Sequence, residues 1–519
     1  MGFWQFFCFF QLDLLVLLLR KAKVWQIIRV LCRNLRWEMA LKGSKFDWRL
    51  GGLFGVALSV VGAIGLFGRP DLSGILWRSP EAESVVYFDR PARVSEGEQL
   101  ILANYHSPLK DAGIVAYREG NYSEAERLFQ DSLSVERDPE ALIYLNNARV
   151  RQEDKYLTVA VTVNLADDLE VGVAKEILKG VAQAQKEFIE QGNNLKVVIG
   201  DDDSNVESAI ALANKFVASS EILGVIGHYS SALSFEAGQI YQDAGLVMIT
   251  HTAAAPDLTN IGDFIFRTGP NNLYFGEAIV DHVVNEFQVG KLGVFYSSKS
   301  PYSSSLQRVV VNKLGQHDGT DVVVIDADRP GFDVDEDFSI LAAENVGAIA
   351  LLLDRYTTPH SVAIIEKNNR ALPIISGDDA IDNDWQTSAE AEASLGLVAP
   401  VPWHALTNPS ALFPVDSRDL WIENVSWRTA MAYDATRALL KGLQEAAEYE
   451  RHAVQAVLAD PDFVTQGAAD EIIFSDNGDR QHSLKIVKVV RDERSEKGFD
   501  FVPLDVDSDV AAEFLEGQN

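Results

Sequence analysis

From Tyr156 onward, the chain alternates between two patterns of apolar positions. Short runs rich in Val, Ile and Leu lack the polar residue at every second place that a half-exposed strand would show, so they predict strands buried on both faces. Between them, apolar residues recur every three or four positions, as at Leu233, Ala237 and Ile240, which predicts helices. The apolar runs are TVAVTV, KVVIG, LGVIG, VMIT, LGVFY, DVVVID, AIALLL and PIISG. We therefore expect an α/β fold of two doubly wound parallel-sheet lobes.

A different apolar pattern, long and uninterrupted, occurs near the N-terminus. Residues 50–68, LGGLFGVALSVVGAIGLFG, carry no charge and are long enough to cross a bilayer as a transmembrane helix. The segment before them, residues 1–49, is basic, which by the positive-inside rule predicts that the chain beyond Arg69 lies outside the cytoplasm. We expect an uncleaved signal anchor with the soluble domain on the periplasmic side, and a cleaved signal peptide is the alternative.

Two interpretations fit the basic segment itself. Residues 3–19 are apolar apart from Asp13, so they could form an additional span that leaves the following basic stretch in the cytoplasm. Alternatively, Met39 is the true start, because MALKGSKFDWR and the apolar run after it make a complete signal anchor.

Between the anchor and the regular α/β pattern we expect a polar tether, residues 69–106, followed by a helical segment, residues 107–152. In the helical segment, small, small, aromatic and helix-starting residues fall close to their places in a tetratricopeptide repeat. These residues are Gly113, Ala125, Phe129 and Pro139. Because one and a half repeats bury little surface alone, we expect a helical hairpin that either packs on a neighbouring domain or forms a peptide groove.

Composition excludes several classes of function. The formal net charge is −31 although the first fifty residues are basic, so the folded remainder is strongly acidic, which disfavours nucleic acid as a partner. Both cysteines, Cys8 and Cys32, precede the predicted anchor, and the domain after it has neither a disulfide framework nor a cysteine metal cluster.

Catalytic motifs are missing as well. The chain contains no phosphate loop GxxxxGK[ST], no HExxH, no GxSxG and no GxGxxG after a strand. Its nine histidines are scattered without metal-ligand spacing, and GDDDSN at residues 200–205 lacks the arrangement of a calcium loop. The sequence predicts a binding protein without a cofactor or metal, and not an enzyme.

Polar groups instead follow the predicted strands. In open parallel sheets, ligands bind beyond the carboxyl ends of the strands. The segments at these ends are HYSS, HTAAAPD, SSKSPY, DRY and DD. Their small hydroxyls, amides, aromatic rings and carboxylates suit a small polar or zwitterionic solute. Ser230 and Ser231 stand where a helix begins, where an ordinary cap is the alternative to a ligand contact.

Residues 156–485 resemble the type I periplasmic solute-binding proteins of ABC transporters, in particular the branched-chain (Leu/Ile/Val) amino-acid binding family. The resemblance extends over the whole region and keeps its order. It is carried by DDDSNVESAIALANKFV, GVIGHYSS, YQDAGLVMITHTAAAPDLT, FIFRTGP, SPYSSSL, AMAYDATRALL and FSDNGDR.

The resemblance implies two lobes joined by a hinge. The first lobe would comprise about residues 156–273 and 403–482, and the second about residues 274–402 together with the C-terminal end of the domain. An acidic C-terminal segment, residues 486–519, would follow. Closure of the lobes around a ligand would then shift an equilibrium between open and closed states.

The resemblance also implies a set of ligand-binding residues. Ser231, with the amides of the helix start beside Ser230, matches the serine that holds the ligand carboxylate. Tyr302 matches an aromatic residue that closes over the ligand from the second lobe. Asp378, with Asp379 beside it, is nearest to the acid that neutralises the ligand's ammonium group.

Two further positions bear on specificity. Thr252 matches a residue whose backbone carbonyl faces the ligand amine. Ala254 stands where the amino-acid binders carry a threonine, so its amide remains but the hydroxyl contact to the amine is lost. The opening loop NLADDLEVG also lacks the family's Gly-Pro element. We therefore expect a small polar solute, an amino acid or a related zwitterion or amide.

The sequence thus predicts a membrane-anchored receptor that delivers a solute to an ABC permease. The alternative is a protein with the same fold but no role in transport. Such a regulator of the cell envelope would use the binding fold and the helical segment as docking surfaces for an envelope protein. The two functions can be distinguished by whether a small solute occupies the cleft, which is expected of a receptor and not of a docking protein.

Overall fold

The computed structural model describes residues 93–166, 168–317, 319–379, 392–408, 411–481, 483–492 and 499–506. The predicted anchor, residues 50–68, and the segments around it up to residue 92 lie outside this range. Among the residues that are described, no helix is both long and apolar enough to cross a membrane.

The first sheet has six strands in the order β1-β3-β2-β4-β5-β6. Its strands are β1 (Arg93–Ser95), β2 (Leu157–Val163), β3 (Leu195–Asp201), β4 (Ile222–Ile226), β5 (Val247–Thr250) and β6 (Ile265–Arg267). Strands β2 to β6 run parallel, with Val161 opposite Ile199 and Ile226 in the register. They are buried almost throughout, as their continuous apolar runs predict.

The second sheet has seven strands in the order β15-β14-β11-β10-β9-β7-β8. Its strands are β7 (Lys291–Tyr296), β8 (Asp321–Asp326), β9 (Ala348–Leu352), β10 (Ile374–Ser376), β11 (Val398–Val401), β14 (Lys485–Arg491) and β15 (Phe499–Pro503). Strands β7 to β11 are parallel, whereas β14 and β15 are antiparallel additions. A small third sheet pairs β12 (Thr465–Gln466) with β13 (Glu471–Ile472).

The expectation of purely parallel sheets is therefore wrong at the edges. In the first sheet β1 pairs antiparallel with β3, and in the second β14 pairs antiparallel with both β11 and β15. The short connection between β14 and β15 allows only an antiparallel pair, because a parallel pair needs a long crossover. The run KIVKVVR of β14 alternates more than the central strands do, and its burial alternates accordingly.

These edge strands extend the folded body beyond the expected domain. Residues 93–95, placed by the sequence analysis in a polar tether, belong to the first sheet. Residues 485–491 and 499–503, which reach into the expected acidic C-terminal segment, complete the second sheet.

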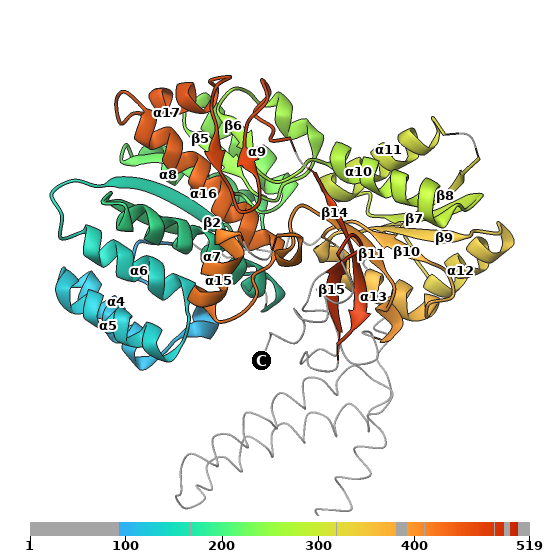
Figure 1. Ribbon diagram of the computed structural model, residues 1–519, viewed down its shortest axis with the longest axis horizontal. Helices are drawn as coiled ribbons and strands as arrows, with labels where there is room; N and C mark the ends of the chain where they lie inside the picture. The colour runs from blue at the N-terminus through green and yellow to red at the C-terminus, as the bar shows by residue number, and fades with distance from the viewer. Residues whose placement is uncertain are drawn as a thin grey trace, which may run out of the picture. The chain divides into compact units, whose positions relative to one another are not determined.

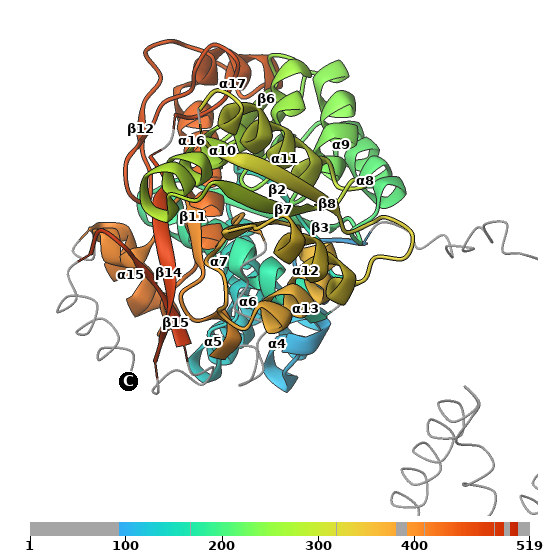
Figure 2. The same ribbon diagram turned by 90° about the vertical axis from the view of Figure 1, so that its right-hand side faces the viewer.

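Helices cover both faces of each sheet (Figures 1 and 2). Around the first sheet lie α7 (Asp168–Glu190), α8 (Val206–Ala218), α9 (Ser231–Asp243), α15 (Leu412–Trp421), α16 (Trp427–Glu445) and α17 (Arg451–Leu458). Around the second lie α10 (Asn272–His282), α11 (Pro301–Leu314), α12 (Val334–Ala343) and α13 (Thr358–Asn368). We call each sheet with its helices the first lobe and the second lobe. Short helical turns are η1 (Ala103–Tyr105), η2 (Pro256–Asn260), η3 (Val283–Phe287), η4 (Arg355–Thr357) and η5 (Ala405–Thr407).

Helices α7 and α16 pack closely within the first lobe. Gly180 of α7 lies against the backbone of α16, where an added Cβ would come within 2.3 Å of the Thr429 carbonyl oxygen. Only glycine permits this approach. The Thr429 hydroxyl in turn donates a hydrogen bond of 3.0 Å to the Glu176 carbonyl oxygen, which fixes the start of α16 on α7.

The helical segment before β2 forms α4 (Pro108–Arg118), α5 (Tyr122–Val135) and α6 (Pro139–Val150). Helix α6 is buried on nearly all sides and packs on α5, α7 and β3. Its Asn147 side chain donates to the Val197 carbonyl of β3 over 2.7 Å, while Lys110 of α4 is buried between Asp138 and Glu140. The segment therefore packs on the first lobe, and its assignment as a tetratricopeptide repeat stays a prediction.

The chain crosses between the lobes after β6, after β11 and again before β14. At the first crossing, Arg267 pairs with Asp479, which precedes the last crossing, through a 2.8 Å hydrogen bond from Nε to Oδ1. Asn271 donates to the other oxygen of Asp479 over 2.8 Å. These contacts join the connecting segments at the hinge.

Candidate ligand-binding site

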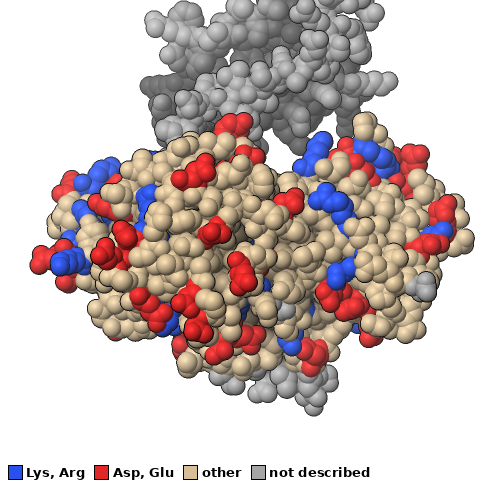
Figure 3. All heavy atoms as spheres, turned by 90° about the horizontal axis from the view of Figure 1, so that it is seen from above, with Lys and Arg blue, Asp and Glu red and all other residues tan. Residues whose placement is uncertain are grey.

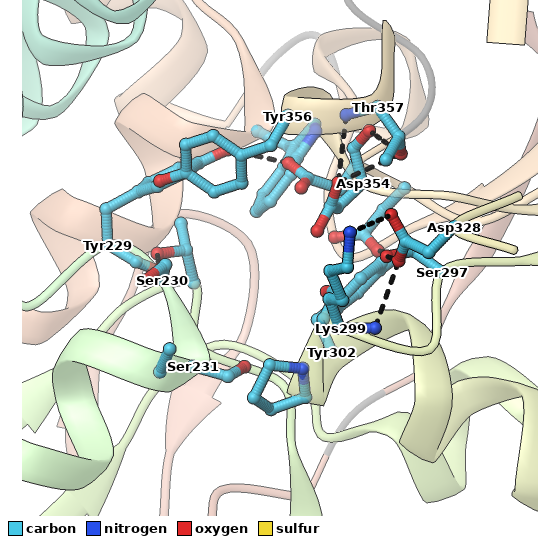
Figure 4. A pocket seen from close by; sticks show the side chains of 17 residues that line it. Tyr229, Ser230, Ser231, Ser297, Lys299, Tyr302, Asp328, Asp354, Tyr356 and Thr357 are labelled. Carbon is cyan, nitrogen blue, oxygen red and sulfur yellow. Dashed lines mark hydrogen bonds and ion pairs between the residues drawn. The ribbon is translucent and has the colours of Figure 1, made fainter. Parts of the chain in front are cut away.

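A cavity of about 320 Å³ lies between the lobes, at the carboxyl ends of their parallel strands. Its walls come from the loops after β4 and β5 in the first lobe, the loops after β7, β8, β9 and β10 in the second, and the start of α16. Figure 4 shows Ser230 and Ser231 on one side of the cavity and Tyr302 on another. This is the position that open α/β sheets offer to ligands.

The structure brings most of the predicted site residues together. Those that line the cavity are Ser230, Ser231, Thr252, Tyr302 and Asp378, with Asp379 beside them. Ala254 is fully buried and belongs to the apolar cluster that also contains Phe275 and Tyr302, so its methyl group packs behind the wall.

The two serines have different roles at the start of α9. The Ser230 hydroxyl accepts a hydrogen bond from the Leu233 amide over 3.3 Å, which makes it the N-cap of the helix. The Ser231 hydroxyl accepts from the Ala255 amide over 3.1 Å and thereby ties the loop after β5 to α9. Its own proton can be donated to a ligand, at a helix N-terminus whose partial positive charge favours an anion.

Arg267 holds the loop after β5 in place. Its guanidinium donates to the Ala253 and Ala255 carbonyl oxygens over 3.1 and 2.9 Å, while Asp479 balances its charge. Within the same loop, the Thr252 hydroxyl donates to the Tyr229 carbonyl over 2.7 Å. Arg267 stands in the segment FIFRTGP, but its role could not be predicted from that segment because its partners lie elsewhere in the chain.

In the second lobe, Tyr302 and Asp378 form a pair. Tyr302 is near the start of α11, and its hydroxyl donates to Oδ1 of Asp378 over 2.7 Å. Burial, with the nearby negative charge of Asp379, raises the pKa of Asp378 to about 7, while the Tyr302 hydrogen bond and Arg428 act in the opposite direction. Asp378 is thus a buried carboxylate that a positive charge would stabilise.

Asp379 has partners on both sides of the cleft. The Tyr229 hydroxyl donates to its Oδ1 over 2.6 Å, and Arg428 Nη2 lies 3.3 Å from the same oxygen. Its Oδ2 accepts from the Arg355 amide over 3.2 Å. Tyr229 and Arg428 belong to the first lobe, so this carboxylate bridges the two lobes.

A second ion pair crosses the cleft nearby. Arg355 Nε of η4 lies 3.1 Å from Oε1 of Glu170 in α7, and both side chains are only 3% exposed. Glu170 and Arg355 lie in NLADDLEVG and DRY, two loops that the sequence places at the site. Their ion pair and the contact of Arg428 with Asp379 could not be predicted, since the partners stand far apart in the chain.

The remaining wall, in the second lobe, is polar. Asp328 accepts hydrogen bonds from the Ser297 hydroxyl and from the Lys299 amide, and these hold its pKa below the usual value although burial acts in the opposite direction. Asp354 accepts from the Thr357 amide and hydroxyl over 3.1 and 3.0 Å, while burial raises its pKa. The wall offers acceptors to a polar or cationic group.

Metal-ligating clusters and basic surface patches were two further possibilities for a site. Among the residues that the structure describes, no group of three or more His, Cys, Asp or Glu side chains is arranged to hold a metal ion. On the face shown in Figure 3, basic and acidic side chains are interspersed and form no continuous basic patch.

Comparisons with known proteins agree with this geometry. The model of a family described as periplasmic binding protein matches residues 170–495. The leucine-, isoleucine-, valine-, threonine- and alanine-binding protein of Pseudomonas aeruginosa is 26% identical over 308 residues, which cover 58% of this chain and 80% of that protein. This relative is a binding protein, so the expectation of a binding protein and not an enzyme is confirmed.

Solved structures share the fold. A leucine-binding protein from Thermotoga maritima superposes with a TM-score of 0.58 at 20% identity, covering 68% of this chain and 99% of that one. A solute-binding protein from Rhodopseudomonas palustris, solved with 3,4-dihydroxybenzoic acid, superposes with a TM-score of 0.56 at 14% identity, covering 67% and 96%. Since the family match spans more than half of the sequence, the chain belongs to the periplasmic binding protein family.

Proposed function

We propose that this protein is an extracytoplasmic solute-binding receptor that closes around a small solute carrying an amine and an anionic group. The observation that carries the proposal is that Ser231 and Asp378 line the same cavity from opposite lobes. One offers a hydroxyl at a helix N-terminus, which suits an anion, and the other offers a buried carboxylate, which suits a cation. A zwitterion satisfies both and bridges the lobes.

The relatives support an amino acid as the solute class. The Pseudomonas aeruginosa protein is named for five amino acids, and the Thermotoga maritima protein for leucine. The fold alone accommodates other chemistry, because the Rhodopseudomonas palustris protein was solved with an aromatic acid. Asp378 and the acceptors of the second lobe are what favour an amine on the solute. The cavity volume of about 320 Å³ suits a small molecule.

Delivery to an ABC permease and attachment to the membrane complete the proposal. Receptors of this kind couple solute binding to closure of the lobes, and the closed form is what a permease would recognise. The uncharged residues 50–68 and the basic residues before them support an anchor that places the binding domain on the periplasmic side.

A thermal-shift screen of the full-length chain in detergent tests the proposal. Each amino acid is compared with its deaminated and its decarboxylated analogue, so that each charged end of the solute is tested separately. A true solute at about 100 times its dissociation constant should add roughly 2.7 kcal/mol to stability, and neither analogue should match it. If no solute in the panel stabilises the protein, the receptor proposal fails and a docking role for the same fold, through α4 to α6, takes its place.

A further inference from the structure

Asp378 and Asp379 are neighbours in the sequence but differ in their partners. Asp378 accepts its side-chain hydrogen bond from the neutral Tyr302 hydroxyl, within the second lobe. Asp379 instead receives Tyr229 at 2.6 Å and Arg428 at 3.3 Å, both from the first lobe. Two carboxylates that could both be assigned to a ligand are thus placed in different environments.

The contacts of Asp379 continue into the second ion pair. Arg355 donates its amide to Asp379 over 3.2 Å, and its side chain pairs with Glu170 of the first lobe over 3.1 Å. We call this network the cross-lobe latch; it consists of Glu170, Arg355, Asp379, Arg428 and Tyr229. Every contact just named is made by the chain itself.

Burial makes these contacts strong. Side chains of Arg428 and Asp379 are 5% and 15% exposed, and those of Arg355 and Glu170 are 3% exposed. While the lobes are closed, a charge in such a position that loses its partner is left buried and uncompensated, so each half of the network favours the presence of the other. Separation of the lobes breaks both ion pairs at once.

We propose that the cross-lobe latch stabilises the closed arrangement of the lobes already in the absence of a solute, so that a solute shifts the equilibrium further towards it, and that it leaves Asp378 as the acceptor for the solute's cationic group. The second half of this proposal rests on the proposed function, whereas the first half does not. Asp379 is then a positioning residue: it sets the distance between the lobes and makes no contact with the solute.

The experiment measures the distance between the lobes in the full-length chain without added solute. The two cysteines, Cys8 and Cys32, are replaced by serine, and spin labels are attached through Glu207→Cys in the first lobe and Glu366→Cys in the second. Both of these positions are exposed. Electron–electron double resonance then gives the distribution of distances between the labels.

Three variants test the latch itself. In the parent, a short distance should be clearly populated. Asp379→Asn and Arg428→Gln should each lower the population at this distance about tenfold or more, and Arg428→Lys, which keeps a cation, should restore most of it. Arg149→Gln is the matched control: it removes the cation of an ion pair with Glu126 outside the latch and should leave the distribution unchanged.

Asp378→Asn tests whether a co-purified solute holds the lobes together. If such a solute held the lobes together through Asp378, Asp378→Asn would open them, and this result would overturn the proposal. An open parent, or an unchanged distribution in Asp379→Asn, would do the same. Circular dichroism verifies folding, and Glu170→Gln, which alters the latch from a different helix, should also open the lobes. Because no solute is added, the result is independent of the solute screen.

Discussion

The Tyr302 hydroxyl donates a hydrogen bond of 2.7 Å to Asp378 Oδ1, so the aromatic residue expected to cover the solute also orients the carboxylate expected to receive its amine. Both side chains come from the second lobe, from the start of α11 and the loop after β10. They would therefore move together when the lobes close, and the amine contact would form together with the aromatic one.

The first prediction concerns amine recognition by Asp378. For a stabilising amino acid, Asp378→Asn should weaken binding about tenfold to a hundredfold, because a hydrogen bond to a charged group contributes about 1.5–3 kcal/mol. Binding of the deaminated analogue should change little. Calorimetric titration of both compounds into both proteins measures this. If the substitution weakened binding of both compounds equally, Asp378 would not recognise the amine.

The second prediction concerns pH. Burial and Asp379 raise the pKa of Asp378 to about 7, whereas a carboxyl in an unfolded chain titrates near pH ~4. Between these values the folded protein holds a proton that the unfolded chain has lost, so the contribution of Asp378 to the free energy of unfolding falls as pH rises through this interval. A solute ammonium prefers the ionised carboxylate, and affinity should therefore increase up to about pH 7 and level off above it.

Asp378→Asn provides the control for the pH effect. Denaturant unfolding and calorimetric titration between about pH 5 and pH 8 should show a smaller pH dependence of both stability and affinity in this variant, because the titrating group is gone. Identical pH profiles in the parent and the variant would assign the effect to other groups, such as the Asp354 carboxyl, whose pKa is also raised by burial.

The third prediction separates the two serines of α9. Ser231→Ala removes the hydroxyl proposed to contact the solute's anionic group, and it should lower affinity about tenfold to a hundredfold. It should also lower stability somewhat, because the Ala255 amide loses its acceptor. Ser230→Ala, the matched control, removes only the N-cap and should cost about 1 kcal/mol of stability at little loss of affinity. A Ser231→Ala variant with reduced melting temperature but unchanged affinity would mean that this serine is structural only.

A fourth prediction concerns the anchor proposed for residues 50–68. The full-length protein should sediment with the membrane, resist extraction by carbonate and keep its N-terminal segment, since an uncharged stretch of this length inserts stably. Protease added from the periplasmic side should reach the binding domain. Mature protein in the soluble periplasmic fraction, cleaved near residue 70, would favour the signal-peptide alternative.

Much of the fold could be predicted because burial on both faces leaves a local signal. Runs such as VMIT and AIALL are apolar without alternation, and they form β5 and β9, which have a neighbouring strand on each side. The edges were harder to predict: short β1 carries no such run, and β14 and β15 lie in a segment interpreted from its acidity alone.

The features of the site likewise include some that the sequence could predict and some that it could not. Ser231, Tyr302 and Asp378 could be found because each follows a strand closely, where sheets place their ligands. The pairings of Arg428 and Arg355 could not, since their contacts with Asp379 and Glu170 join positions 49 and 185 residues apart. A buried ion pair of this kind depends on the three-dimensional arrangement of the lobes, and no spacing in the sequence encodes it.

A crystal structure of the protein with the most strongly stabilising solute of the panel tests the central claim most directly. We predict that the solute's anionic group lies within hydrogen-bond distance, about 2.7–3.2 Å, of the Ser231 hydroxyl. Its amine should lie at a similar distance from Asp378, while Asp379 stays paired with Arg428. A solute bound outside the cavity, or one whose amine does not contact Asp378, would contradict the account.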